Sequence, residues 1–302
     1  MKTVEIRGII PPVITPMNED ESVNLAQLRH QVERMIQGGC HGIFPCGTNG
    51  EGYILEPAEK QQVLETVIDQ CAGRVPVYAG TGCVSTRETI RQSRLARDAG
   101  ADILSVITPS FAAASQEELY QHYQAVALSV ELPIVLYNIP ARTGNALAPA
   151  TVARLAKIDN IVGAKDSSGS FQNLLGYIEA GKTKENGGFA ALSGNDQLII
   201  WTLLAGGAGG IAGCANVYPR TLASVYELYR QGRMEEARAA NESIQSLRDC
   251  FRYGNPNTIV KMAVRLLGYE VGKCRAPFNQ VSLEGTEALK AVLEENRKKG
   301  MR

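Results

Sequence analysis

Lys165 is the residue of this 302-residue chain whose setting points most directly to chemistry. It lies in the segment IVGAKDSSG, residues 161–169, where an apolar, strand-like run gives way to a polar turn. A lysine at the end of a buried strand loses the solvation of its ammonium group, so it must find a partner or give up its proton. A neutral amine is the nucleophile that condenses with a ketone. We interpret Lys165 as a candidate Schiff-base lysine; the alternative is a solvated strand-end charge paired with Asp166.

A second candidate segment is the turn PCGTNGE at residues 45–51. Thr48 and Asn49 supply a hydroxyl and an amide beside backbone N–H groups, a combination that can hold a small carboxylate. The surrounding glycines are also typical of a plain turn, and that alternative stays open. We therefore treat Thr48 and Asn49 as candidate binding residues.

The third candidate segment is YNIPARTG at residues 137–144. The phenol of Tyr137 can pass a proton during carbinolamine formation and C–C bond cleavage. Arg142, on the following loop, can clamp a second carboxylate of a substrate. The alternatives without a function are a half-buried aromatic strand residue for Tyr137 and a solvated loop arginine for Arg142. The segment alone does not decide between these and the functional interpretation.

Short apolar, β-branched runs recur along the chain with helical patterns between them, which predicts βα units and a parallel sheet. The eight expected strands begin near Gly8, Gly42, Val75, Asp102, Pro133, Ile161, Phe189 and Gly209. Eight strands close a (β/α)8 TIM barrel, in which reactive groups lie at the C-terminal strand ends, and all three candidate segments fall there. The alternative is a doubly wound open sheet, but the glycine-rich run at residues 47–52 is not the GxGxxG nucleotide fingerprint.

Helical patterns lie between the expected strands and continue beyond them. The predicted helices cover residues 25–37, 57–70, 87–99, 116–129, 149–156, 171–179 and 196–204, then 221–230, 234–252, 256–267 and 283–299. Beyond Pro219 no strand-like run remains. We therefore predict a (β/α)8 barrel at residues 1–225 and a C-terminal helical extension, packed on the barrel, at residues 226–302.

Charge and hydropathy exclude several classes of partner. The 31 basic and 31 acidic residues cancel, so the electrostatic footprint of a nucleic-acid binder is missing. The N-terminal residues 1–7 are charged and no apolar run reaches the length of a membrane span, so we expect neither a signal peptide nor a membrane partner. We predict a cytoplasmic protein that acts on a small molecule.

Cysteine and histidine usage argues against metal and disulfide chemistry. The seven cysteines are odd in number and scattered, without a C-x-x-C spacing, which indicates reduced thiols in a cytosolic protein. The only histidines are His30, His41 and His122, and two of them fall within helical patterns. Zinc sites and Ser-His-Asp triads both need a well-placed histidine, so we predict neither, and no metal.

Taken together, the order and spacing of the motifs resemble the dihydrodipicolinate synthase/N-acetylneuraminate lyase family of class I aldolases over nearly the whole chain. The motifs are GIIPPVITP at residues 8–16, then GTNGE, YNIPARTG, GAKDSSG, LSGND at residues 192–196, and GGI at residues 209–211. The resemblance implies a (β/α)8 barrel with a helical extension, and a lysine imine with pyruvate or another 2-oxo acid. It also implies that no cofactor is needed and that the protein is a homo-oligomer, a tetramer or a dimer.

The resemblance also implies a role for each candidate residue. Lys165 would form the imine and Tyr137 would shuttle protons, both as catalytic residues. The substrate-binding residues would be Thr48 and Asn49 for the 2-oxo acid carboxylate, Gly194 and Ile211 through their backbones, and Arg142 at the aldehyde end.

The chain departs from the synthase pattern at two positions. Asn49 stands where synthases have a second threonine, and Phe111 stands where they have a tyrosine that reaches a neighbouring subunit's site. The KDSSG run is similar to relatives that cleave 2-keto-3-deoxy sugar acids or 4-hydroxy-2-oxo acids, so our main prediction is a carbon–carbon lyase acting on the C3–C4 bond of such a substrate. One alternative is 4-hydroxy-tetrahydrodipicolinate synthase, which condenses pyruvate with aspartate semialdehyde. The other is a non-catalytic 2-oxo-acid-binding protein.

Overall fold

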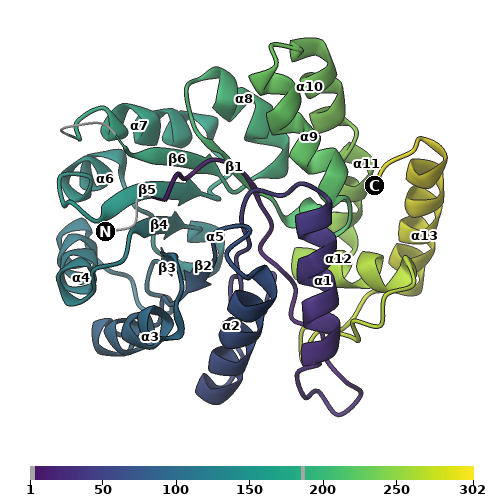
Figure 1. The fold of residues 1–302 in the computed structure, drawn as a ribbon, viewed down its shortest axis with the longest axis horizontal. Helices are drawn as coiled ribbons and strands as arrows, with labels where there is room; N and C mark the ends of the chain where they lie inside the picture. Colours follow the sequence, from purple (N-terminus) through teal and green to yellow (C-terminus); the bar gives the residue numbers. More distant parts are fainter. Residues whose placement is uncertain (1–3, 185–187) are drawn as a thin grey trace. The chain divides into compact units, whose positions relative to one another are not determined.

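The structure is a computed structural model that describes residues 4–184 and 188–302 (Figure 1). The chain separates into two compact units. The first unit comprises the described residues up to Gly8 together with Pro76–Ile211, and the second comprises Ile9–Val75 and Ala212–Arg302. The second unit is therefore assembled from two segments that are far apart in the sequence.

The first unit is built on parallel strands. They are β2 (Tyr78–Gly80), β3 (Ile103–Ile107), β4 (Ile134–Asn138), β5 (Ile161–Asp166), β6 (Ala190–Ser193) and β7 (Gly209–Ile211). The sheet order is β1-β7-β6-β5-β4-β3-β2, and β1 (Gly8–Ile10) joins it where the Gly8 N–H donates to Ala208 O at 2.8 Å. Because the strands from β2 to β7 are parallel, their carboxyl ends lie along one edge.

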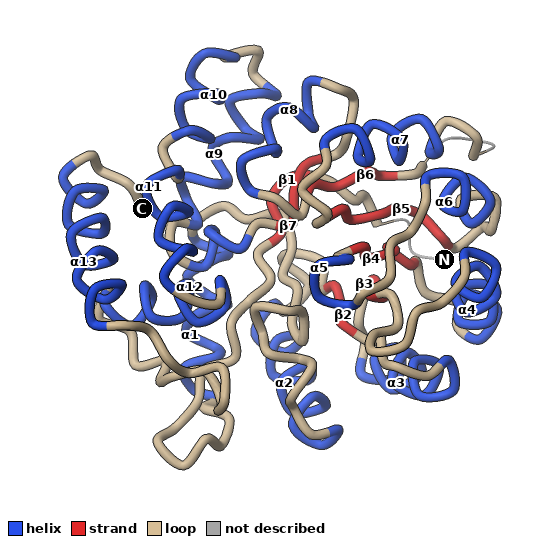
Figure 2. The backbone as a smooth tube through the Cα atoms, turned by 180° about the vertical axis from the view of Figure 1, so that it is seen from behind, coloured by secondary structure: helices blue, strands red, loops and turns tan. Residues whose placement is uncertain are grey.

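Helices of the first unit lie outside its strands, as both views show (Figures 1 and 2). They are α3 (Thr86–Ala99), α4 (Gln116–Ser129), α6 (Pro149–Leu155), α7 (Phe171–Gly181) and α8 (Ile199–Leu204). The unit also contains the short helix α5 (Pro140–Thr143) after β4 and the 3-10 turn η1 (Asp196–Leu198) before α8. The apolar side chains of β4 are buried, and so are those of β3 except the half-buried Ile107, as expected of parallel strands covered on both faces.

Local capping signals fix where helices begin. Ser115 and Glu118 form a capping box at the start of α4, in which the Ser115 side chain accepts the Glu118 N–H and the Glu118 carboxylate accepts the Ser115 N–H. Helix α4 has the bounds predicted from the sequence, and so does α1 (Leu25–Gln37), which Asn24 caps. The helix predicted over residues 196–204 is divided instead into the turn η1 and helix α8.

The strand predicted to begin near Gly42 is wrong as a regular strand. Residues 41–44 run extended beside residues 9–13, linked by His41 N to Ile9 O (2.8 Å), Phe44 N to Pro11 O (2.9 Å) and Val13 N to Phe44 O (3.1 Å). Pro11 and Pro12 carry no N–H group, so a continuous ladder cannot form on that side. The segment keeps the path of a strand without its full hydrogen bonding.

The second unit is helical. It contains α1, α2 (Pro57–Cys71), α9 (Pro219–Arg230), α10 (Met234–Glu242), α11 (Gln245–Asp249), α12 (Pro256–Leu266) and α13 (Leu283–Lys298), with the 3-10 turns η2 (Gly213–Asn216) and η3 (Cys250–Tyr253). The single helix predicted over residues 234–252 is interrupted after α10, where the Ser243 hydroxyl donates to Ala240 O at 2.7 Å. The predicted division of the chain at residue 225 stays a prediction.

Candidate active site

Lys165 lies near the end of β5 and is buried, with 4% of its surface exposed. In the register of β4 with β5, Tyr137 is its partner, so the two side chains project from the same face of the sheet. The Lys165 Nζ atom lies 3.8 Å from the centroid of the Tyr137 ring. The structure thus brings together the two predicted catalytic residues, and Lys165 is not a solvated strand-end charge.

Asp166 follows Lys165 in the strand and projects from the opposite face. Its buried carboxylate accepts hydrogen bonds from the Asn138 amide (2.7 Å), the Asn173 amide (3.1 Å) and the Ser168 hydroxyl (2.7 Å). These bonds tie the ends of β4 and β5 to the start of α7. Asp166 therefore fixes the strand end that carries Lys165.

Gly194 lies directly against the lysine stem. A Cβ atom at this position would lie 2.8 Å from Lys165 Cε and 1.9 Å from Ser167 Oγ, so no larger residue fits without displacing them. The Gly194 N–H donates to Asp166 O at 2.7 Å, which anchors the loop after β6 to the end of β5. The backbone of Gly194 is consequently one wall of the space around Lys165.

The other two predicted residues of the first unit lie at different depths. Ile211 ends β7 and is buried, at the same carboxyl edge of the sheet as Lys165. Arg142 lies in α5, four residues beyond the end of strand β4, and its side chain is exposed. Arg142 is thus a charged group open to solvent, close in sequence to Tyr137.

The loop that carries Phe111 is held by Asn145, a residue that sequence analysis missed. The Asn145 amide donates to Pro109 O (2.9 Å) and Ala112 O (2.8 Å), and its carbonyl oxygen accepts the Ala114 N–H (2.7 Å). Phe111 itself has a left-handed backbone (φ 80°) and a fully exposed ring. The only sequence signal for Asn145 was its place just after the YNIPARTG motif.

Thr48 and Asn49 lie in the second unit, side by side in the predicted turn and half-buried. The Glu51 N–H donates to Thr48 O (3.1 Å) and the Gly52 N–H donates to Gly47 O (3.1 Å), which closes the turn. A Cβ atom at Gly52 would lie 2.0 Å from Cys46 O, so the tight closure requires glycine there. The turn predicted from the sequence is confirmed.

The cysteine beside this turn is not a reactive thiol. Burial raises the pKa of the Cys46 thiol, next to this turn, to about 12, so that thiol stays protonated at neutral pH. Among the described residues, no group of three or more His, Cys, Asp or Glu side chains is placed to hold a metal ion. No helix in the described ranges has both the length and the apolar character that crossing a membrane requires.

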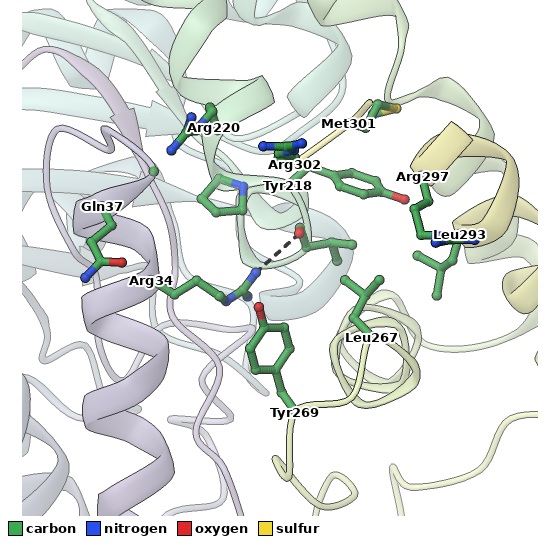
Figure 3. Close-up of a pocket in the computed structure, with 13 residues that line it drawn as sticks. Arg34, Gln37, Tyr218, Arg220, Leu267, Tyr269, Leu293, Arg297, Met301 and Arg302 are labelled. Atoms are coloured by element: carbon green, nitrogen blue, oxygen red, sulfur yellow. Dashed lines mark hydrogen bonds between the residues drawn. The ribbon is translucent and has the colours of Figure 1, made fainter. Parts of the chain in front are cut away.

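A separate hollow of about 360 Å³ lies in the second unit (Figure 3). One wall is Arg34, whose guanidinium lies 4.5 Å from the Tyr269 ring centroid and donates to the backbone oxygens of Asn216 and Val217. Burial lowers the pKa of Arg34 from its ordinary value. None of the predicted site residues lines this hollow. The bonds that Arg34 donates join α1 to the end of η2.

The chain is similar to known proteins over nearly its whole length. A model of the dihydrodipicolinate synthetase family matches residues 5–296. A 4-hydroxy-tetrahydrodipicolinate synthase of Syntrophus aciditrophicus is 40% identical over 288 residues, which cover 95% of this chain and 97% of that protein.

Solved structures extend this similarity. The dihydrodipicolinate synthase of Acinetobacter baumannii, solved with pyruvate, is 36% identical with a TM-score of 0.91 and covers 96% of this chain and 98% of its own. The synthase of Thermotoga maritima is 28% identical with a TM-score of 0.93, covering 97% and 99%. These likenesses confirm the predicted class, a (β/α)8 barrel with a C-terminal helical extension.

Proposed function

Because this chain belongs to the dihydrodipicolinate synthetase family and is a carbon–carbon lyase of that family, we propose that it is a 4-hydroxy-tetrahydrodipicolinate synthase. It would condense pyruvate with aspartate semialdehyde. The names of its relatives favour this alternative over the sugar-acid lyase that we predicted first. The observation that carries the chemistry is the buried amine of Lys165, 3.8 Å from the ring centroid of Tyr137.

The first step forms the imine. Lys165 Nζ attacks C2 of pyruvate, a carbinolamine results, and its hydroxyl leaves as water once it is protonated. The Tyr137 phenol, on the adjacent strand, carries that proton. Support for this step comes from the burial of Lys165 and from its register with Tyr137.

The second step forms the carbon–carbon bond. The protonated imine withdraws electrons, C3 loses a proton to the Tyr137 phenolate left by the first step, and the resulting enamine attacks the aldehyde carbon of aspartate semialdehyde. Tyr137 gives a proton to the aldehyde oxygen as the bond forms. The amino group of the condensed semialdehyde then attacks C2, closes the ring and displaces the Lys165 amine.

The remaining predicted residues hold the reactants. Thr48 and Asn49 would bind the pyruvate carboxylate, and Gly194 and Ile211 would line the pyruvate pocket with their backbones. Arg142 would bind the carboxylate of the semialdehyde, because a planar guanidinium makes two parallel bonds to such a group. Its exposure supports a place at the entrance rather than beside the imine.

A second candidate function is cleavage of a 2-keto-3-deoxy sugar acid or a 4-hydroxy-2-oxo acid with release of pyruvate. The observation that favours it is Phe111, whose exposed ring has no hydroxyl to pass a proton. The imine chemistry at Lys165 would be the same, run in the direction of cleavage. Only the aldehyde fragment would differ.

Two measurements test these proposals. Borohydride reduction in the presence of pyruvate should leave a stable adduct on Lys165, identified by mass spectrometry, and Lys165→Arg should leave none. Turnover is then compared for pyruvate with aspartate semialdehyde and for a panel of 2-keto-3-deoxy acids. Faster release of pyruvate from one of those acids favours the second candidate, whereas an adduct without any turnover points to a binding protein.

We infer that the protein is cytoplasmic and forms a homo-oligomer, a tetramer or a dimer. Supporting the oligomer, the first unit exposes two large apolar side chains on α8, Trp201 and Leu204, which are three residues apart and so lie on the same face. An exposed apolar helix face of this kind is commonly covered by another copy of the chain. Light scattering on the purified protein gives the subunit number, and a monomer at micromolar concentration would contradict the inference.

A further inference from the structure

The turn that carries Thr48 and Asn49 is joined to the C-terminal helices by a buried ion pair. Lys261 Nζ, on α12, lies 2.7 Å from Glu51 Oε1, and the two side chains are 1% and 0% exposed. The other carboxylate oxygen, Glu51 Oε2, accepts the Arg275 N–H at 2.8 Å. A buried ion pair gains little net stability over an apolar pair of the same size, so its presence calls for another explanation.

Helix α12 holds the turn at a second point. The Asn257 amide donates to Thr48 O at 2.8 Å, and Asn257 is itself buried. Asn257 and Lys261 are four residues apart and so lie on the same face of α12. One helix face therefore binds both the backbone of Thr48 and the side chain of Glu51.

The backbone of Glu51 gives an independent indication that its side chain is required. Its φ of 56° lies in the left-handed region, where glycine is the residue with least strain. The chain has glycine at the neighbouring positions 50 and 52 but glutamate at this one. The carboxylate, and not the backbone, accounts for the choice of residue.

Asn49 is held from the other side by η2. A Cβ atom at Gly213 would lie 2.9 Å from Asn49 Nδ2, so the amide packs on bare backbone. Asn216 fixes that backbone, since its amide donates to Gly213 O and Pro12 O, both at 3.0 Å. Both predicted carboxylate-binding residues are thus positioned by chain beyond residue 211.

We propose that Glu51, Lys261 and Asn257 are positioning residues that hold Thr48 and Asn49 in the conformation that binds the carboxylate of a 2-oxo acid. This inference rests on the proposed function. It assigns to α12 a part in substrate affinity, although the helix carries no catalytic group. A fixed set of donors binds a carboxylate more tightly than one that must first be ordered.

The test uses Asn257→Ala, with Asn296→Ala as the matched control. Asn296 is also a buried asparagine on a helix of the second unit, where its side chain donates to Tyr218 OH at 3.1 Å and accepts from Ser246 Oγ at 3.2 Å. For Asn257→Ala, the pyruvate concentration that gives half-maximal adduct on Lys165 should rise roughly tenfold or more. The adduct formed at saturating pyruvate and kcat should stay within about twofold, because the amine is unchanged.

The double variant Glu51→Gln with Lys261→Met removes both charges while keeping the buried volume, and it should show the same rise. The proposal would be overturned if the pyruvate concentration that gives half-maximal adduct is unchanged in Asn257→Ala, or if it rises equally in Asn296→Ala. If the double variant does not fold, Asn257→Ala alone decides.

The failure of this inference can be told from failure of the proposed function. If the wild-type protein forms no pyruvate adduct, the proposed function is wrong and hydrogen exchange becomes the readout. The Glu51 and Gly52 amides, which close the turn, should then exchange at least tenfold faster in Asn257→Ala than in Asn296→Ala. Equal exchange in the two variants would show that Asn257 does not position the turn.

Discussion

The Asn138 amide donates to Asp166 Oδ1 at 2.7 Å, and these two residues directly follow Tyr137 and Lys165 on the paired strands β4 and β5. The bond lies on the opposite face from the lysine and the tyrosine. Asn138 also accepts the Leu147 N–H at 3.0 Å. The register of the two predicted catalytic residues is thus reinforced by a side-chain bond one position further along.

Replacing Asn138 by alanine should lower the free energy of unfolding by about 1–3 kcal/mol, because it leaves the buried Asp166 carboxylate short of a donor. Urea unfolding measures the loss. Asn173→Ala, which removes a longer bond to the same oxygen from a less buried residue, serves as the comparison and should cost less. Equal losses in the free energy of unfolding would show that the bond from Asn138 to Asp166 stabilises the protein no more than the bond from Asn173 does.

Gly194→Ala should slow formation of the Lys165 adduct by about a hundredfold, because the new methyl group would displace the lysine stem or the Ser167 hydroxyl. The rate of borohydride trapping with pyruvate is the measurement. In Gly207→Ala a methyl group meets Thr202 Cγ2 at 2.5 Å, away from the lysine, so that variant should lose stability but keep its trapping rate. Trapping at the wild-type rate in Gly194→Ala would show that the Gly194 backbone does not limit the space around Lys165.

His122 makes the first unit sensitive to acid. Burial lowers the pKa of this histidine from 6.5 to about 4, and its Nε2 atom has no hydrogen-bond partner among the described residues. Between those two values the unfolded chain binds a proton that the folded chain does not, so stability is present above about pH 6.5 and is lost as the pH falls towards 4. From pH 7 to 4.5, the wild-type protein should lose about 2–3 kcal/mol more than His122→Gln.

Urea unfolding of both proteins at the two pH values gives this difference, because the titration of the carboxylates is common to both. Thr86 Oγ1 lies 2.9 Å from His122 Nδ1, and glutamine can keep a hydrogen bond to it. Parallel pH dependence of the two proteins would contradict the prediction.

Phe111→Gly should stabilise the protein by about 0.5–1 kcal/mol. A left-handed non-glycine residue costs about 1–2 kcal/mol, part of which is offset by the greater freedom of glycine in the unfolded chain, and the exposed ring loses no packing. Thermal unfolding gives the change. Ser110→Gly is the control, since Ser110 is not left-handed and its replacement should not stabilise.

Phe111→Tyr tests the missing hydroxyl at the same position. If a proton passes through this site during condensation, turnover of aspartate semialdehyde should rise roughly tenfold or more, since a positioned proton-transfer group contributes on that scale. Adduct formation with pyruvate alone should not change. A change in turnover below about twofold would show that protons take another route.

Much of this architecture was predictable because local signals carry it. The helices predicted over residues 25–37 and 116–129 have the observed bounds, and in the structure Asn24 and Ser115 cap them. The rule that reactive groups lie at strand ends placed Tyr137 and Lys165 together. The irregular strand at residues 41–44 was also predictable, because Pro11 and Pro12 in the segment beside it lack the N–H groups that regular strand pairing needs.

Other parts of the site could not be predicted in this way. The pairing of Glu51 with Lys261 and the clamp made by Asn145 join residues distant in sequence through side-chain hydrogen bonds. Hydrophobic periodicity reports which face of an element is buried, and it carries no information on which polar side chains meet across the fold. Such contacts become visible only once the backbone is placed.

The discontinuous make-up of the second unit has a consequence during synthesis. Ile9–Val75 leaves the ribosome first, yet the partners of its turn, such as Lys261, are added only after the whole of Pro76–Ile211. At roughly 5–20 residues per second, this early segment waits for about ten seconds or more before those partners exist. The continuous stretch Pro76–Ile211, which carries Lys165, is complete sooner. The nascent chain can therefore fold around the Lys165 amine before the residues that bind the turn with Thr48 have been synthesised.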